Sequence, residues 1–187
     1  MWGSISVKID LSTYNNTWFK TASKYKIVTW LIFSRIFFKT SIPYPSFFKV
    51  FLLKVFGTQC GKNIVIKPCV NIKYPWLLSI GDNVWIGEDV WIDNLCSVYI
   101  FESVCISQGA MLLTGNHDYS KTTFDLIIGG ITLKPGVWVG AKSIVCPNVT
   151  LNENSVLSVN SVATKDLESN YIYQGNPAVK KKLRVIS

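Results

Sequence analysis

The chain has 187 residues, of which 49% are apolar and 16% are charged, and its formal net charge is +8. This length suffices for a domain with a substantial core, and the apolar content excludes an intrinsically disordered chain. The five cysteines are scattered, odd in number and without a CxxC pair. That pattern argues against a disulfide framework and a zinc ribbon, and predicts a reducing compartment.

The positive charge is concentrated at the N-terminal end. Residues 1–74 contain eleven lysines and arginines against one acidic residue, Asp10, whereas residues 75–187 contain eight basic and ten acidic residues. Fourteen of the 25 aromatic residues lie in the first 60 positions. We therefore expect a basic, aromatic, helical extension over 1–60, a main body over 61–168 and a C-terminal tail over 169–187.

Within the extension, residues 24–57 predict two short helices separated by the turn Pro43-Tyr44-Pro45. The apolar run over 27–38 contains Arg35 and is about twelve residues long, whereas a membrane span needs roughly 20. Two compatible interpretations stay open: an amphipathic cap on the following domain, or a face that contacts an anionic membrane. Nucleic acid is not expected, because the basic residues alternate with bulky apolar ones and no known motif is present.

The main body repeats every six residues, with two extra residues before Ile80 and before Ile100. A branched aliphatic residue recurs at Ile66, Ile72, Ile80, Ile86, Ile92, Ile100, Ile106, Leu112, Leu133, Val139, Val145, Leu151 and Leu157. A small or β-branched residue often follows four positions later, as at Val84, Val90, Ala110, Ser143, Val149 and Ser155. This period fits neither an α-helix nor a simple alternating strand, and it is typical of a parallel β-helix with one short strand per side. We expect the aliphatic residues to point inward, with Gly or Asn turning the corners.

The repeat breaks between Leu112 and Leu133, which predicts a loop over 117–131 that leaves the coil wall. A long loop in a regular scaffold is usually functional, and this one begins with His117, the only histidine in the sequence. Histidine is well suited to general base catalysis at neutral pH. His117 is therefore the candidate catalytic residue, and Asp118, Asp93 or a main-chain oxygen could orient its ring. Cys96 is expected in the core rather than as a nucleophile.

Five stretches resemble a known family: "YPWLLSIGDNVWIGEDVWIDNL" (74–95), "VCISQGAMLLTGNHDYS" (104–120), "VWVGAKSIVCPNVTL" (137–151), "SVATKDL" (161–167) and "YQGNPA" (173–178). They are similar to hexapeptide-repeat acyltransferases, and within them to the colanic acid biosynthesis acetyltransferase (WcaF-like) group. The resemblance implies an all-β, left-handed parallel β-helix. It also implies a homotrimer with active sites between neighbouring prisms. The implied activity is O-acetylation of a sugar hydroxyl from acetyl-CoA in surface polysaccharide biosynthesis, without a metal.

The resemblance also implies roles for single residues. His117 corresponds to the general base, Asn94 to an acceptor-binding residue and Trp138 to a residue that covers the active site. CoA contacts are implied for Gly140, Ala141, Val159, Thr164, Lys165 and Lys182, the last toward a phosphate. Two departures from the family pattern, "IFES" (100–103) and "SVNS" (158–161), predict altered packing of the coils there.

Two other classes fit the sequence less well. Zinc carbonic anhydrases built on such repeats use three histidines, which a chain with one histidine cannot supply. A non-catalytic scaffold that organises glycan-assembly enzymes at a membrane explains the basic N-terminus but not the loop with His117. We expect a cytoplasmic protein, with peripheral contact at the inner face of the bacterial cytoplasmic membrane. Some of Trp85, Trp91 and Trp138 are expected at the trimer interface.

Overall fold

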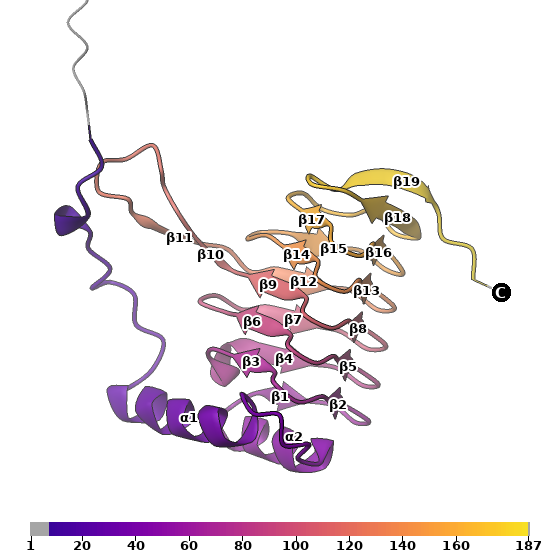
Figure 1. Ribbon diagram of the computed structural model, residues 1–187, viewed down its shortest axis with the longest axis horizontal. Coiled ribbons are helices and arrows are strands. Elements are labelled where there is room, and N and C mark those ends of the chain that lie inside the picture. The colour runs from indigo at the N-terminus through magenta and orange to yellow at the C-terminus, as the bar shows by residue number, and fades with distance from the viewer. Residues whose placement is uncertain (1–7, 187) are drawn as a thin grey trace, which may run out of the picture.

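Three walls of short parallel strands form a coil in the computed structural model, which describes residues 8–186 (Figure 1). The first wall contains β1 (Gln59–Cys60), β4 (Leu78–Ile80), β7 (Val98–Ile100), β12 (Ile131–Leu133) and β15 (Thr150–Leu151). The second wall contains β2 (Val65–Ile66), β5 (Trp85–Ile86), β8 (Cys105–Ile106), β13 (Trp138–Val139), β16 (Val156–Leu157), β18 (Tyr171–Gln174) and β19 (Val179–Leu183). The third wall contains β3 (Asn71–Ile72), β6 (Trp91–Asp93), β9 (Met111–Leu113), β14 (Ile144–Val145) and β17 (Val162–Ala163). The predicted β-helix is confirmed.

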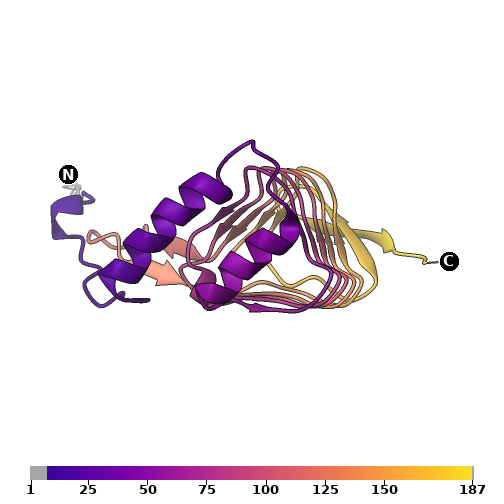
Figure 2. The ribbon, with the colours of Figure 1, turned by 90° about the horizontal axis from the view of Figure 1, so that it is seen from below.

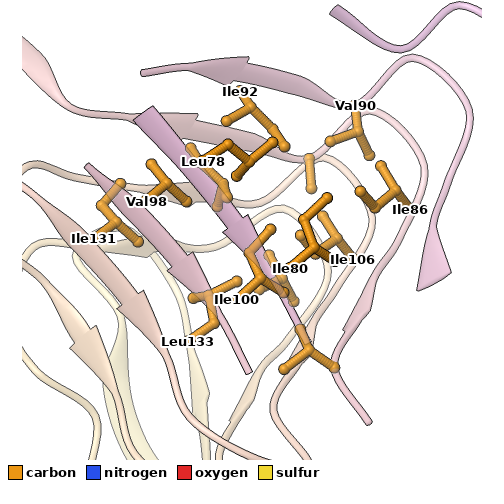
Figure 3. Packing of buried hydrophobic residues seen from close by; sticks show 14 of the residues in the cluster. Leu78, Ile80, Ile86, Val90, Ile92, Val98, Ile100, Ile106, Ile131 and Leu133 are labelled. Carbon is orange, nitrogen blue, oxygen red and sulfur yellow. The ribbon is translucent and has the colours of Figure 1, made fainter. Parts of the chain in front are cut away.

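The core is the column of aliphatic side chains that the six-residue repeat supplies. All thirteen repeat positions named above are at most 2% exposed, and the small or β-branched residues four positions later are buried as well. Equivalent residues stack from coil to coil, as Ile80 pairs with Ile100 and Ile100 with Leu133 (Figure 3). The inward direction predicted for the aliphatic residues is therefore confirmed.

The corners of the coil use asparagine and glycine for different physical reasons. Six asparagines take a left-handed φ of 54–64° at the turns, namely Asn63, Asn83, Asn148, Asn154, Asn160 and Asn170, a conformation that asparagine tolerates. Glycines that follow a repeat aliphatic instead allow close stacking. A Cβ on Gly87 would lie 2.8 Å from Gln108 N, and one on Gly140 would lie 2.6 Å from Val159 N. At Gly87 and Gly140 the corner therefore needs glycine for the close approach of the adjacent coil.

The two departures from the repeat do not interrupt the ladder of hydrogen bonds. Phe101 N donates to Leu133 O at 2.9 Å, and Ser158 N donates to Tyr173 O at 2.8 Å. The ring of Phe101 lies on the surface, and Lys134 Nζ is 4.9 Å from its centroid. The altered packing of the coils that was predicted at these positions is therefore not seen in the main-chain hydrogen bonds.

Two helices cross the N-terminal end of the coil (Figure 2), as the sequence predicted: α1 (Lys24–Phe37) and α2 (Ser46–Val55). The Ser23 side chain caps α1 by accepting from Lys26 N, and Pro43 and Pro45 lie between the helices. Short 3₁₀ helices occupy Leu11–Thr13 and Pro75–Leu77. Within residues 8–186, no helix is long and apolar enough to cross a membrane.

The helices cap the first coil, which has no preceding coil to pair its strands. Trp30, fully buried, donates from Nε1 to Ile72 O at 2.9 Å. Lys49, also fully buried, donates from Nζ to Lys67 O at 2.9 Å, and Ser46 Oγ accepts from Ile66 N at 3.0 Å. Burial lowers the pKa of Lys49. An unpaired strand edge invites association with other chains. These side chains bond to the main-chain groups at that edge, so the two helices are the cap that the sequence predicted.

The C-terminal end is closed by strands. The segment 169–187, expected as a tail, supplies β18, which continues the second wall in parallel with β16, and β19, which folds back antiparallel to β18. The Arg184 guanidinium then donates to Gly136 O at 2.8 Å and to Asn154 O at 3.1 Å. Both ends of the core are therefore covered.

Candidate active site

An antiparallel hairpin leaves the coil between β9 and β12 (Figure 1). Its strands are β10 (Gly115–His117) and β11 (Leu126–Ile128), and we call residues 115–128 the arm. The base of the arm is fixed to the coil, because Gly129 N donates to Thr114 O at 2.8 Å and Thr114 Oγ1 donates to Asp93 O at 3.0 Å. Cys96 lies at this base and is half-buried, so its expected place in the core was wrong.

His117 is held in one orientation on β10. Its Nδ1 lies 2.9 Å from Phe124 O, and its ring stacks on the Phe124 ring with centroids 4.4 Å apart and planes 8° apart. A carbonyl oxygen only accepts hydrogen bonds, so the assigned tautomer carries its proton on Nδ1. Nε2 is then left with a free lone pair. The main-chain oxygen is thus the orienting group among the three that the sequence left open.

The two carboxylates that were alternatives are engaged elsewhere. Asp118 accepts from Ser120 N at 3.0 Å and from the Ser120 hydroxyl, which holds the pKa of Asp118 below its ordinary value. Asp93 lies 2.9 Å from Lys73 Nζ. Neither group is the partner of His117 Nδ1.

Phe124 combines both contacts with His117 through an unusual backbone conformation. Its φ is +50°, a left-handed value that costs a bulky residue about 1–3 kcal/mol. The turn that imposes this value is closed by Phe124 N donating to Lys121 O at 3.1 Å and by Asp118 N donating to Asp125 O at 2.8 Å. Lys121 also pairs with Asp125 at 2.9 Å. Such strain beside the candidate catalytic residue His117 is consistent with a preorganised site.

The N-terminal segment reaches the arm from the other end of the sequence. Asp10 N donates to Thr122 O at 2.9 Å, and the ring of Tyr14 lies 5.6 Å from the His117 ring, tilted by 59°. Sequence reasoning identified neither Tyr14 nor Phe124 as a site residue. Neither follows a periodic pattern, and Tyr14 is about a hundred residues from His117 along the chain.

A second group of predicted residues meets at the corner between the second and third walls. Gly140 N donates to Leu157 O at 2.7 Å, Asn160 N donates to Ala141 O at 2.9 Å, and Val159 is 60% exposed above them. Trp138, next to this corner, is 47% exposed and donates from Nε1 to Ser107 Oγ at 2.9 Å. A groove beside it is lined by Trp85, Gly87, Ser107 and Gln108.

The remaining predicted CoA residues lie apart from this corner. Thr164 and Lys165 are exposed directly after β17, at the corner where the third wall leads to the first, and Lys182 is exposed on β19. The arm leaves from that same third-to-first corner, on the side of the coil away from β13 (Figure 1). Within one chain, the structure therefore does not bring His117 together with Trp138, Gly140 and Ala141.

Asn94 does not have the free side chain that an acceptor-binding residue needs. It is fully buried, its Oδ1 accepts from Tyr74 N at 3.0 Å, and its Nδ2 donates to Tyr74 O at 2.6 Å. The Asn94 amide thus links its own coil to the preceding one through both its oxygen and its nitrogen. The structure therefore does not support the acceptor contact expected for Asn94, because its buried amide already binds the Tyr74 main chain.

Three of the five cysteines do not have the properties of nucleophiles. Burial raises the pKa of Cys60 to about 11 and also raises the pKa values of Cys105 and Cys146. These thiols are protonated near neutral pH, whereas a nucleophilic cysteine needs its thiolate form. In the described part of the chain, no three side chains of His, Cys, Asp or Glu come together as metal ligands would.

A coil built on six-residue repeats, with one arm that carries a histidine, defines the class of hexapeptide-repeat acetyltransferases. No family model matches the chain. WcaF of Escherichia coli (strain K12), named for colanic acid biosynthesis as an acetyltransferase, is 34% identical over 167 residues, which cover 89% of this chain and 92% of WcaF. The chain therefore belongs to the WcaF group of this class.

Further comparisons agree with this assignment. The galactoside O-acetyltransferase of Escherichia coli (strain K12) is 29% identical over 129 residues, covering 67% of this chain and 64% of that one. A solved galactoside acetyltransferase in complex with coenzyme A has a TM-score of 0.74, with 24% identity over 86% of this chain and 82% of that one. A hexapeptide-repeat acetyltransferase from Vibrio cholerae complexed with acetyl coenzyme A has a TM-score of 0.72, with 21% identity over 78% of this chain and 81% of that one.

Proposed function

We propose that the protein transfers an acetyl group from acetyl-CoA to a sugar hydroxyl in surface polysaccharide biosynthesis, with His117 as general base. The observation that carries the proposal is the fixed imidazole, whose Nδ1 is bound to Phe124 O at 2.9 Å on an arm outside the coil. Nε2 is thereby available to a substrate hydroxyl. The relatives named for colanic acid biosynthesis and for galactoside O-acetylation support a sugar acceptor.

The arm supplies the proton transfers that the reaction needs. His117 Nε2 takes the hydroxyl proton as the acceptor oxygen attacks the thioester carbonyl, and the Phe124 carbonyl stabilises the imidazolium that forms. When the carbon–sulfur bond breaks, the imidazolium returns its proton to the departing thiolate, and CoA and the acetyl ester are released. A positioned base of this kind contributes about 10²–10⁴-fold in rate.

We propose that acetyl-CoA binds at the corner between the second and third walls. Gly140 is buried at this corner, whereas Ala141 is half-buried and Trp138 is exposed beside the groove at Gly87. We propose that Val159 lines the same corner, and that Thr164, at the third-to-first corner, lines a separate part of the donor site. Lys165 and Lys182 are exposed cations that suit the CoA phosphates. These assignments complete the donor side of the proposal.

A homotrimer would complete the active site. Because His117 and Trp138 lie on different sides of one coil, a neighbouring coil packed side by side would supply the missing half. Trp85, Trp91 and Trp138 are 57%, 38% and 47% exposed on the flat walls, and large exposed aromatics often mark interfaces. We expect a trimer in analytical ultracentrifugation, and a stable monomer at micromolar concentration would contradict this arrangement.

The direct test of the function is incubation of the full chain with acetyl-CoA and candidate acceptors. The acceptors should include nucleotide sugars, lipid-linked oligosaccharides and finished polymer, with the new ester located by mass spectrometry. We expect stoichiometric release of CoA and one acetylated hydroxyl. No acetyl-CoA consumption with any acceptor would favour a non-catalytic scaffold at the membrane.

A further inference from the structure

The outer surface of the two capping helices is apolar although it faces away from the coil. We call this surface, residues 24–55 seen in Figure 2, the cap face. Its large exposed side chains are Tyr25, Val28, Leu31, Ile32, Ile36, Ile42, Phe47, Phe51 and Val55, which are 49–87% exposed. The opposite side of the same helices holds Trp30, Leu52 and Leu53 in the core. The cap face is therefore a second apolar surface, which the fold of one chain does not bury.

The charges around this surface are of one sign. The sequence contains no acidic residue between positions 11 and 81. A groove on α1 is lined by Val28, Leu31, Ile32 and Ile36 together with Arg35 and Lys39. Burial lowers the pKa of Lys39, and the neighbouring charges of Arg35 and Lys73 lower it further. Cations are thus crowded at the edge of an apolar groove without a carboxylate in the cap sequence to balance them.

Not every basic residue of the cap is available for an external partner. Lys49 is bound to main-chain carbonyl oxygens inside the cap, and Lys26 Nζ lies 4.8 Å from the centroid of the Trp76 ring. Lys24, Arg35, Lys39 and Lys54 are exposed on the helices or directly after α1. These four residues form the external charge of the cap face.

We propose that the cap face docks on an anionic lipid bilayer. A lipid surface offers what this face lacks, namely phosphate charges for the cations and an apolar layer for the isoleucine and phenylalanine side chains. The two helices lie side by side across the end of the coil (Figure 2), so their outer side chains can meet one plane. Side-by-side coils in the proposed trimer would present three such faces to the same membrane. The docking otherwise rests on the cap alone.

The test is vesicle flotation of the full chain with phosphatidylcholine vesicles, with or without phosphatidylglycerol, at low and high salt. One variant removes charge, Arg35→Gln with Lys39→Gln, and another removes apolar contact, Ile32→Ser with Ile36→Ser. Matched controls outside the cap face are Lys142→Gln with Lys181→Gln and Val185→Ser with Ile186→Ser; all four residues are exposed. Circular dichroism and acetyl-CoA turnover with a soluble acceptor are measured on every variant.

We expect binding to anionic vesicles that weakens with salt, because salt screens surface charge. Each basic residue near such a membrane contributes about 1 kcal/mol, so the loss of two should weaken binding about thirty-fold. The apolar variant should also bind more weakly, while both controls bind like wild type.

Three results would overturn the docking proposal. The first is equal binding to neutral and anionic vesicles, and the second is no binding to either. The third is self-association of the protein in the absence of vesicles, if the Ile32→Ser with Ile36→Ser variant abolishes that self-association. Unchanged turnover in such a result would leave the proposed acetyl transfer intact, so the two proposals fail separately.

Discussion

Phe124→Ala tests whether the arm orients the imidazole of His117, the proposed general base, through the aromatic stack. The substitution removes the ring that lies 4.4 Å from the His117 ring but leaves the main-chain carbonyl that binds Nδ1. An aromatic pair contributes about 0.5–1.5 kcal/mol beyond its buried area. If that energy selects the productive ring orientation, its loss should lower kcat by about 2- to 13-fold. Alanine at φ +50° carries a backbone cost similar to that of phenylalanine, so the change isolates the ring.

The comparison with Phe124→Gly separates the ring from the carbonyl. Glycine relieves the left-handed strain at this position and frees the turn, so the carbonyl no longer stays beneath Nδ1 and kcat should fall further than in Phe124→Ala. The assay is the initial rate of CoA release at saturating acceptor, with KM for acetyl-CoA expected to stay within twofold of wild type. Tyr119→Ala is the control, because Tyr119 is on the same arm and 82% exposed. A folded Phe124→Ala protein with the kcat of wild type would refute this account of the arm.

Three further substitutions or conditions test the scaffold and the arm. Trp30→Ala should lower the free energy of urea unfolding by about 3–5 kcal/mol, because the indole is fully buried and hydrogen-bonded to Ile72 O. Trp18→Ala, which removes a 58% exposed ring, is the control, and an equal loss of stability in both variants would show that the cap does not stabilise the coil. Gly87→Ala should cost about 1–3 kcal/mol, because its Cβ would lie 2.8 Å from Gln108 N, whereas Gln108→Ala should be neutral; equal stabilities would argue against close stacking at this corner. Hydrogen bonds from Ser120 lower the pKa of Asp118, and the bond from Lys121 lowers that of Asp125. Their stabilisation of the turn is therefore present above about pH 4 and lost as pH falls below it. Hydrogen exchange of residues 118–125, corrected for intrinsic rates, should rise on acidification, and greater protection in acid would contradict the assignment.

The sequence predicts the coil because one rule repeats many times. Each residue of the series from Ile66 to Leu157 faces the same environment, so a single period identifies the core, and its interruption identifies the arm. The two helices follow from apolar segments on either side of Pro43 and Pro45. Their capping role was one of two open interpretations, which the bonds of Trp30 and Lys49 to the first coil establish.

The site was less predictable, since its geometry depends on single contacts without a period. The carbonyl of Phe124 reaches His117 only because the turn holds φ of Phe124 at +50°. Tyr14 comes from the N-terminal segment, far from His117 in sequence, and its ring packs near the His117 ring only in the folded chain. Asn94 matched a motif, yet its amide is occupied by Tyr74. Gly140 likewise has a packing reason, close approach to Val159, that a motif match does not reveal.

The central claim is that His117 is the general base of an acetyl transfer, and His117→Ala tests it most directly. The measurement pairs the turnover of acetyl-CoA with the affinity for CoA from calorimetry on the same folded sample. Removal of a positioned base predicts a loss of about 10²–10⁴-fold in kcat, with CoA affinity within twofold of wild type. Turnover close to wild type in a correctly folded His117→Ala protein would contradict the account.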